Sequence, residues 1–198
     1  MRQGQIVFRV SFFLPAVLSL VIVGIIWGWV YNPLFGLLNS TLRALGLESW
    51  TRGWLGEPGW ALAAIILAGA WTYFGFCMVV FLAALQGVDR SLYEAAVIDG
   101  ASRPQVFWHI TLPSIRGVIT LMMVNSLVGS FKVFDIVYVM TAGGPFHNTD
   151  VIGTYMYTRA FRQSLVGYSA SMAVVLTVVV VAGSLFLLWF RERTEVSV

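Results

Sequence analysis

Three long stretches of this 198-residue chain carry no charged residue, and they limit its fold more than any other feature. One lies between Arg9 and Arg43, another runs from Pro58 to Val88, and the third lies between Arg162 and Arg191. The hydrocarbon core of a membrane contains no water that could form hydrogen bonds with the backbone. A segment that spans it therefore has to form its backbone hydrogen bonds internally, as an α-helix. About 20 apolar residues in a helix cross a ~30 Å hydrocarbon core. The sequence therefore predicts an all-α, polytopic transmembrane bundle.

Composition indicates the same class of protein. Hydrophobic residues make up 59% of the chain and charged residues only 11%, whereas about a quarter of a soluble domain is charged. The net charge of +3 is scattered along the chain, so no surface for nucleic acid is expected. Cys77 is the only cysteine and lies in an apolar run, which leaves no disulfide framework and no thiolate metal site. No cofactor, metal or catalytic residue is predicted.

Four helical spans are predicted within a single domain of residues 1–198, at about 10–31, 60–85, 117–141 and 172–190. Pro15 is placed in the first turns of the first span, where proline is tolerated. The residues from Asn32-Pro33 to Glu57 are expected to form a short amphipathic surface segment between turns. Residues 146–167 are expected to lie at the interface, partly as helix.

Four spans place both termini on the same side of the membrane as the polar loop 89–116. That side holds seven arginines and the other side four, and an excess of basic residues marks the cytoplasmic side. The loop and both termini are therefore predicted to be cytoplasmic. The seven are Arg2, Arg9, Arg90, Arg103, Arg116, Arg191 and Arg193, and the four are Arg43, Arg52, Arg159 and Arg162.

The first half of loop 89–116 has the pattern of a short capped helix. Ser91 followed by Glu94 is a capping box, in which the two side chains satisfy backbone N–H groups at a helix start. Gly100 is expected to end this helix, because glycine adopts the left-handed conformation without a steric penalty.

The second half of the loop repeats the pattern. Ser102 and Gln105 form another capping box, and Pro104 suits the first turn of a second helix. This helix is predicted to end before Pro113. The two helices carry more apolar surface than a short loop buries by itself. That surface indicates either a partner groove or packing back against the membrane domain, and the pattern alone leaves both open.

The run Glu94-Ala95-Ala96, followed by Gly100, Ile110 and Leu112-Pro113, resembles the EAA signature of the membrane subunits of ATP-binding-cassette (ABC) importers. The resemblance implies a cytoplasmic coupling helix that docks in a cleft of a separate ATPase subunit. Glu94 then has two candidate roles, as a cap of its own helix and as a contact to the ATPase. The residues assigned to coupling are Glu94, Ala95, Ala96, Asp99, Gly100, Phe107, Ile110, Leu112 and Pro113.

Further matches resemble the sugar-importer branch that includes maltose and glycerol-phosphate transporters. They include Tyr31-Asn32-Pro33, Phe134-Asp135, Gly143-Gly144-Pro145 and Gly167-Tyr168. The resemblance implies a permease subunit for a sugar or related polyol in a bacterial or archaeal plasma membrane. Its implied partners are a second permease subunit, an ATPase dimer and an extracytoplasmic solute-binding protein. The branch has a six-helix core and this chain starts at its third helix, so a truncated reading frame, an internal Met start or a short subunit is expected.

Lys132 and Asp135 are the only charged pair inside a predicted span. Three residues apart on one helix, they share a face and can pair. Charges within a membrane usually face a partner or a polar cavity, so the pair either neutralises itself against a neighbouring helix or marks the solute path. The other candidates for the solute path are Asn125, Ser126 and Ser130, which can bond hydroxyl groups, and Tyr138, which can stack on a sugar ring.

Two other classes of function compete with import. An intramembrane protease needs an activated nucleophile, and the nearest approach to Gly-x-Ser-x-Gly, at Gly167-Tyr168-Ser169-Ala170-Ser171, fails at its last position. No phosphate-binding loop is present, so ATP hydrolysis is assigned to a partner and the chain is not expected to be an enzyme. A channel or structural membrane subunit fits the composition equally well, but it has no need for the helix pair in loop 89–116.

Overall fold

The structure is a computed structural model that describes the backbone of residues 3–195 and the side chains of residues 7–191. Every regular element within that part is a helix, as the sequence predicts. Arg2 and the side chain of Arg193, which the charge count includes, lie outside the described residues. The helices are α1 (Gln3–Val17), α2 (Leu20–Val30), α3 (Leu37–Ala44), η1 (Glu48–Trp50), α4 (Trp60–Gln86), α5 (Arg90–Ile98), α6 (Arg103–Val106), η2 (Phe107–Thr111), α7 (Leu112–Ser114), α8 (Arg116–Phe131), α9 (Asp135–Met140), α10 (Ile152–Tyr157), η3 (Thr158–Arg162) and α11 (Val166–Glu195).

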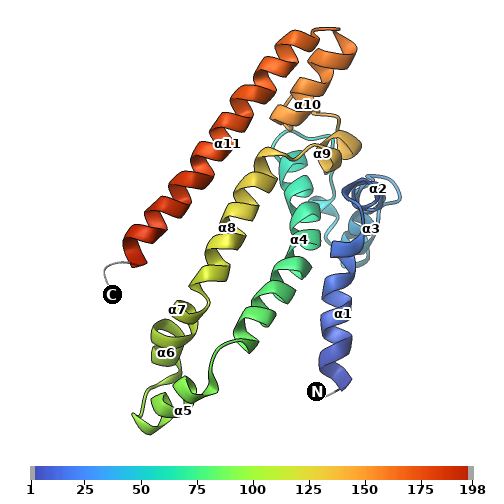
Figure 1. The fold of residues 1–198 in the computed structure, drawn as a ribbon. Coiled ribbons are helices and arrows are strands. Elements are labelled where there is room, and N and C mark those ends of the chain that lie inside the picture. Colours follow the sequence, from blue (N-terminus) through green and yellow to red (C-terminus); the bar gives the residue numbers. More distant parts are fainter. Residues whose placement is uncertain (1–2, 196–198) are drawn as a thin grey trace.

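The long helices α4, α8 and α11 run alongside one another and set the long axis of the molecule (Figure 1). Helix α1 packs along α4, and α8 packs against both α4 and α11. Helices α5 to α7 lie at the same end of the molecule as the start of α1, whereas α9 and α10 lie at the other end. The far end of α11 also points toward the end that carries α5 to α7.

Two helical stretches of the described chain, Trp60–Gln86 and Val166–Arg191, are long and apolar enough to cross a membrane. They cover the predicted spans 60–85 and 172–190. The number rises to four if each of two bent helix pairs counts as one span. These pairs are Val7–Val17 with Leu20–Val30, bent by 103°, and Arg103–Ser114 with Arg116–Phe131, bent by 66°.

The prediction of one continuous helix over 10–31 is wrong, because the chain bends between α1 and α2. Ser19 begins the second helix, and its Oγ accepts a hydrogen bond from the N–H of Ile22 at 3.3 Å. Helix α1 begins at Gln3, so Pro15 lies in its last turn and not in its first turns. Proline removes a backbone donor and clashes with the carbonyl four residues earlier, so Pro15 weakens the last part of α1, which ends two residues later at Val17.

The predicted span 117–141 is not one helix either. Helix α8 ends at Phe131, α9 begins at Asp135, and Phe134 between them has φ −145° and ψ −58°, outside the helical region. Lys132 and Asp135 therefore do not share a face of a continuous helix. Both side chains are exposed, and no ion pair joins these two described residues.

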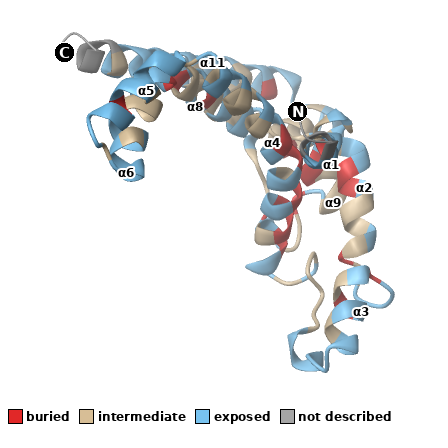
Figure 2. Cartoon of the chain, turned by 90° about the horizontal axis from the view of Figure 1, so that it is seen from below, coloured by how far each residue is buried: buried red, intermediate tan, exposed pale blue. Residues whose placement is uncertain are grey.

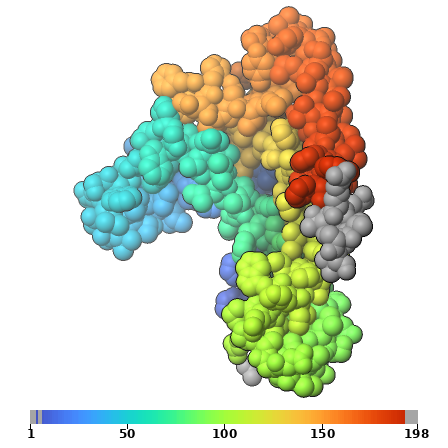
Figure 3. Space-filling model, turned by 90° about the vertical axis from the view of Figure 1, so that its left-hand side faces the viewer, coloured from blue at the N-terminus to red at the C-terminus, as the bar shows by residue number. Residues whose placement is uncertain are grey.

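The core lies where α2, α4 and α9 cross, and burial is concentrated there (Figure 2). It is formed by five packed side chains that are each at most 4% exposed: Val23, Ile65, Ala68, Ile136 and Val137. Much of the surface of α11 is exposed. The residues between α2 and α4 include α3 and η1, and they project sideways from the bundle (Figure 3).

Candidate functional site

Residues 89–116, which we call the elbow, connect α4 to α8 (Figure 1). Helix α5 forms its first arm, and Arg103–Ser114 form its second. The hydroxyl oxygens of Tyr93 and Thr111 lie 3.1 Å apart and share a hydrogen bond, which ties the two arms together.

Asp89, and not Ser91, caps the start of α5. Its Oδ1 accepts a hydrogen bond from the backbone N–H of Ser91 at 2.9 Å. This bond lowers the pKa of Asp89, because it stabilises the ionised carboxylate. The predicted capping box of Ser91 and Glu94 is therefore wrong, since α5 begins one residue before Ser91. Glu94 is exposed, with no hydrogen bond or ion pair to a described residue.

Gly100 ends α5, as the sequence predicts, with φ at +71°. The N–H of Ala101 donates to the carbonyl oxygen of Ala96 at 2.9 Å, and the N–H of Gly100 donates to that of Val97 at 3.1 Å. These two bonds form a Schellman motif, which satisfies carbonyls that a helix end would otherwise leave free. The direction in which the chain leaves α5 thus depends on one left-handed glycine.

The second arm starts as predicted and ends later than predicted. The backbone N–H of Ser102 donates to Oε1 of Gln105 at 2.8 Å, one half of a capping box. The helix does not end before Pro113, however, because a π-helical turn, η2, precedes α7 and the arm continues to Ser114. Sharp bends in helices occur at prolines and at π-turns, and the chain bends by 66° between Arg103–Ser114 and Arg116–Phe131.

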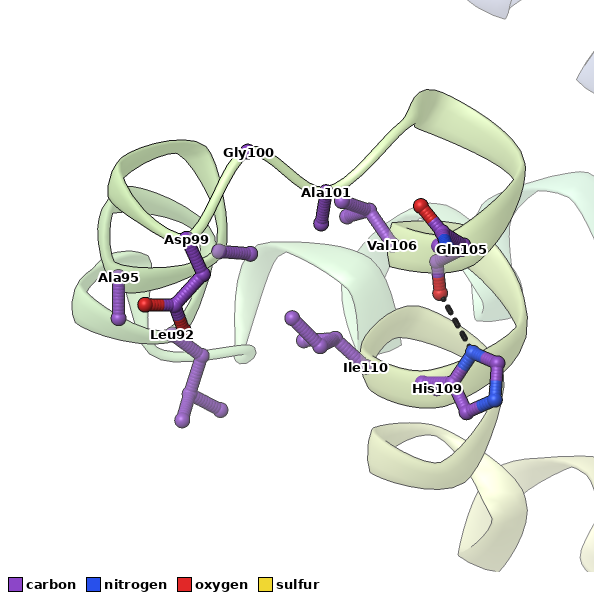
Figure 4. Close-up of a pocket in the computed structure, with 10 residues that line it drawn as sticks. Leu92, Ala95, Asp99, Gly100, Ala101, Gln105, Val106, His109 and Ile110 are labelled. Carbon is purple, nitrogen blue, oxygen red and sulfur yellow. Dashed lines mark hydrogen bonds between the residues drawn. The ribbon is translucent and has the colours of Figure 1, made fainter.

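The two arms enclose an open hollow of about 580 Å³ (Figure 4). The carboxylate of Asp99 lies on the α5 side, and His109 lies on the other side with its Nδ1 3.0 Å from the carbonyl oxygen of Gln105. Most of the side chains that line the hollow are apolar. The hollow is lined by Leu92, Ala95, Ala96, Asp99, Gly100, Ala101, Gln105, Val106, His109 and Ile110.

The outer surface of the elbow is also apolar. Ile98 is 86% exposed and Val97 74% exposed on α5, and Phe107 and Trp108 are exposed on η2. The rest of the chain leaves most of Val97, Ile98 and Trp108, and about half of Phe107, uncovered. Of the two interpretations that the sequence left open, the exposed positions favour a partner groove.

The nine residues assigned to coupling occupy three kinds of position in the elbow. Ala95, Ala96, Asp99, Gly100 and Ile110 line the hollow, Glu94 and Phe107 lie on the exposed surface, and Leu112 and Pro113 form α7. Sequence reasoning missed Gln105 and His109 as lining residues. Their spacing of four residues, which repeats from Val106 to Ile110, is the helical signal that pairs them on one side.

The candidates for the solute path do not gather at one site. Asn125 and Ser126 of α8 meet Tyr73 of α4, whose hydroxyl lies 3.2 Å from Asn125 Oδ1 and 2.9 Å from Ser126 Oγ. Ser126 and Ser130 line a second hollow of about 660 Å³ together with Cys77. Tyr73 was not among the residues predicted from the sequence to line the solute path.

Tyr138 belongs to an aromatic cluster at the other end of the molecule from the elbow. Its ring stacks on Phe134 with a centroid distance of 5.1 Å, and Tyr157 meets it edge-on at 4.9 Å. Arg162 Nη2 donates to the Tyr138 hydroxyl at 3.4 Å. Part of the ring surface predicted to stack on a sugar is therefore covered by Phe134.

Several helices that are apolar over membrane-spanning lengths define a multi-pass membrane protein. Residues 2–196 match the family described as "Binding-protein-dependent transport system inner membrane component", and the chain belongs to this family.

The chain is similar to the "Probable ABC transporter permease protein YurN" of Bacillus subtilis (strain 168), with 36% identity over 189 residues, 96% of this chain and 65% of YurN. It is also similar to the "Lactose transport system permease protein LacF" of Rhizobium radiobacter, with 38% identity, covering 94% of this chain and 63% of LacF. It thus spans just under two thirds of the length of these relatives.

A crystal structure of a bacterial alginate ABC transporter, in complex with an alginate pentasaccharide-bound periplasmic protein, contains a similar chain. The TM-score is 0.88 at 28% identity, over 98% of this chain and 67% of the other. The all-α fold is therefore that of an ABC importer permease.

Proposed function

We propose that the chain is a permease subunit of an ABC importer for a sugar or a related polyol, in a bacterial or archaeal plasma membrane. The observation that carries the proposal is the elbow, with its exposed apolar surface, its hollow and the unpartnered carboxylate of Glu94. Exposed apolar surface on a helix pair of this kind is typical of docking into a partner groove. The partner here is a separate ATPase dimer, which performs the hydrolysis.

The remaining partners follow from the same proposal. A second permease subunit completes the path through the bilayer, and an extracytoplasmic solute-binding protein delivers the solute. The periplasmic protein named in the alginate transporter complex supports the last assignment. The word "lactose" in the name of LacF supports a sugar as the solute class.

The elbow and both termini face the cytoplasm in this proposal. The basic residues Arg90, Arg103 and Arg116 lie in the elbow, and their number there fits the cytoplasmic side. We expect a Ser102→Cys variant in a Cys77→Ala background to react with a membrane-impermeant maleimide from the cytoplasmic side only. An Arg159→Cys variant is the matched control and is expected to react from the other side. Labelling of Ser102→Cys from outside would reverse the orientation.

Glu94→Gln is expected to weaken docking to the ATPase about tenfold or more, because a charge-assisted hydrogen bond contributes roughly 1.5–3 kcal/mol. The substitution leaves α5 itself intact, since Glu94 bonds to no described residue within the chain. Co-purification of the ATPase with the membrane-embedded complex measures the effect. Glu48→Gln, an exposed glutamate outside the elbow, is the control and should change nothing. Equal ATPase recovery from both variants would remove Glu94 from the docking surface.

The solute path is proposed to run along α8 and α9, with Tyr138 at its outer part. Tyr138→Ala removes a ring that stacks on Phe134 and is expected to lower solute uptake several-fold, while ATPase co-purification stays unchanged. Tyr138→Phe keeps the ring and loses only the hydroxyl group with its hydrogen bonds, among them the one from Arg162, so its uptake should stay near that of the parent. Unchanged uptake in the alanine variant would place the solute site elsewhere.

A further inference from the structure

Residues 33–59 project sideways from the half of the molecule away from the elbow (Figure 3). We call these residues the arm, as distinct from the first and second arms of the elbow. The arm contains α3 and η1. Seen along the long axis, α3 stands clear of α4, α8 and α11 (Figure 2). The arm thus extends across the axis of the bundle and not along it.

The buried side chain of Asn39 is the centre of the hydrogen bonds within the arm. This side chain is 2% exposed. Its Nδ2 donates to the carbonyl oxygens of Pro33 at 3.2 Å and of Arg52 at 2.9 Å. Its Oδ1 accepts from Trp54 Nε1 at 2.8 Å and from the N–H of Arg52 at 3.4 Å. One buried amide therefore holds both sides of the arm together.

Three of the four charged side chains of the arm have partners in the described chain, whereas Glu48 is exposed. Arg43 folds back to donate to the carbonyl oxygens of Pro33 and Leu34 at 2.9 Å and 3.3 Å. The guanidinium of Arg52 lies 4.4 Å from the centre of the Trp60 ring, and Glu57 accepts a hydrogen bond from a backbone N–H of the arm at 3.0 Å. Such bonds remove much of the cost of taking these groups out of water.

The formal charge of the arm is zero, because two arginines, Arg43 and Arg52, balance two glutamates, Glu48 and Glu57. The exposed surface of the arm carries polar side chains, among them Arg43 and Glu48, beside an apolar part. Six side chains between 43% and 79% exposed form the apolar part: Leu34, Phe35, Leu37, Leu45, Leu47 and Trp50. Exposed apolar side chains gathered on one segment in this way mark a site of contact with a membrane, a protein or a ligand.

A chain of aromatic rings joins the arm to the ends of two apolar helices. Ring centroids are 5.1 Å apart for Trp27 and Tyr31 at the end of α2, 6.5 Å for Tyr31 and Trp54, and 5.6 Å for Trp54 and Trp60. Trp60 is the first residue of α4. Tryptophan and tyrosine concentrate at the level of lipid headgroups, so these rings place the base of the arm at that level.

We propose that the arm lies in the interfacial layer of the outer leaflet, with the apolar part of its surface against the upper acyl chains. An element that projects across the bundle axis at headgroup level meets lipid on its outer face, and an amphipathic segment binds there through its apolar area. Because the arm is neutral, zwitterionic lipid suffices and salt has little influence. The proposal rests on the membrane crossing and orientation proposed above, and it does not depend on docking to the ATPase.

The test places single cysteines in the full chain, in a Cys77→Ala background reconstituted into phosphatidylcholine vesicles. Phe35→Cys and Leu45→Cys carry an environment-sensitive fluorophore on the arm, and Phe74→Cys carries it on the exposed side of α4. We expect loss of iodide quenching at all three positions. The labels on the arm should be quenched by a lipid with a shallow spin label and the label at Phe74→Cys by a deep one. High salt should leave all values unchanged.

Iodide quenching of both arm labels, with Phe74→Cys protected, would show an arm in water and overturn the proposal. Protection that develops only when a solute-binding protein or second permease is added would also overturn it, in favour of a protein interface. Iodide quenching at Phe74→Cys would instead show that α4 does not cross the bilayer, so a failure of the proposed function is distinguished from a failure of the arm alone.

Discussion

Gly75→Ala is expected to lower the free energy of unfolding by about 3 kcal/mol, the upper part of the range for overpacking a well-packed contact. The reason is local. A Cβ at Gly75 of α4 would overlap the backbone carbonyl of Phe12 in α1, and backbone atoms have no rotamer into which to move. The two helices then have to separate. The unfolding temperature of the purified chain in detergent, followed by tryptophan fluorescence, measures the loss.

Gly69→Ala is the matched control, because the same helix holds Gly69 six residues earlier with nothing within 4 Å of an added Cβ. Alanine is the better helix former by roughly 1 kcal/mol, so this variant should be as stable as the parent or slightly more stable. A similar loss of stability in both variants would mean that the close crossing of α1 and α4 does not set the stability of the fold.

The sequence predicted the elements that depend on hydrophobicity alone. The apolar runs between charged residues located α4 and α11, because an uncharged segment of that length crosses the hydrocarbon core as an α-helix. The break at Leu18-Ser19 was not predicted, since the residues on either side are as apolar as those in a continuous helix. The break at residues 132–134 was not predicted either, because Lys132 and Asp135 were expected to pair on one helix. Contacts with other helices decide such bends. Helix α2 packs on α4 and α9 in the core, and the sequence pattern does not contain that crossing.

The candidate site shows the same division between local and long-range causes. Gly100 and the start of the second arm were predicted correctly, because turn and cap chemistry is set by neighbouring residues. Asp89 was missed because Ser91 offered a plausible cap two residues later. The hollow between the arms depends on the angle fixed by Tyr93 and Thr111, which lie 18 residues apart, so spacing alone does not locate it.

Gly100→Val is expected to reduce docking of the ATPase by about tenfold or more, while the unfolding temperature of the membrane domain changes little. Gly100 has φ +71°, and a β-branched residue is strained there by at least ~1–2 kcal/mol. Nothing lies within 4 Å of an added Cβ, so the effect comes from the backbone alone. The elbow relieves the strain by losing the bonds that end α5, and the second arm then leaves in a different direction. Co-purification of the ATPase and solute uptake measure the result.

Gly46→Val is the matched control for this prediction. Gly46 has φ +73° and equally open surroundings, but it lies in the arm and not in the elbow. The same strain is therefore introduced far from the proposed docking surface, and ATPase recovery should equal that of the parent. Gly100→Asn extends the series, because asparagine tolerates the left-handed region better than other side chains and should retain more docking than valine. If Gly100→Val docks as well as Gly46→Val, the geometry of the elbow does not control coupling.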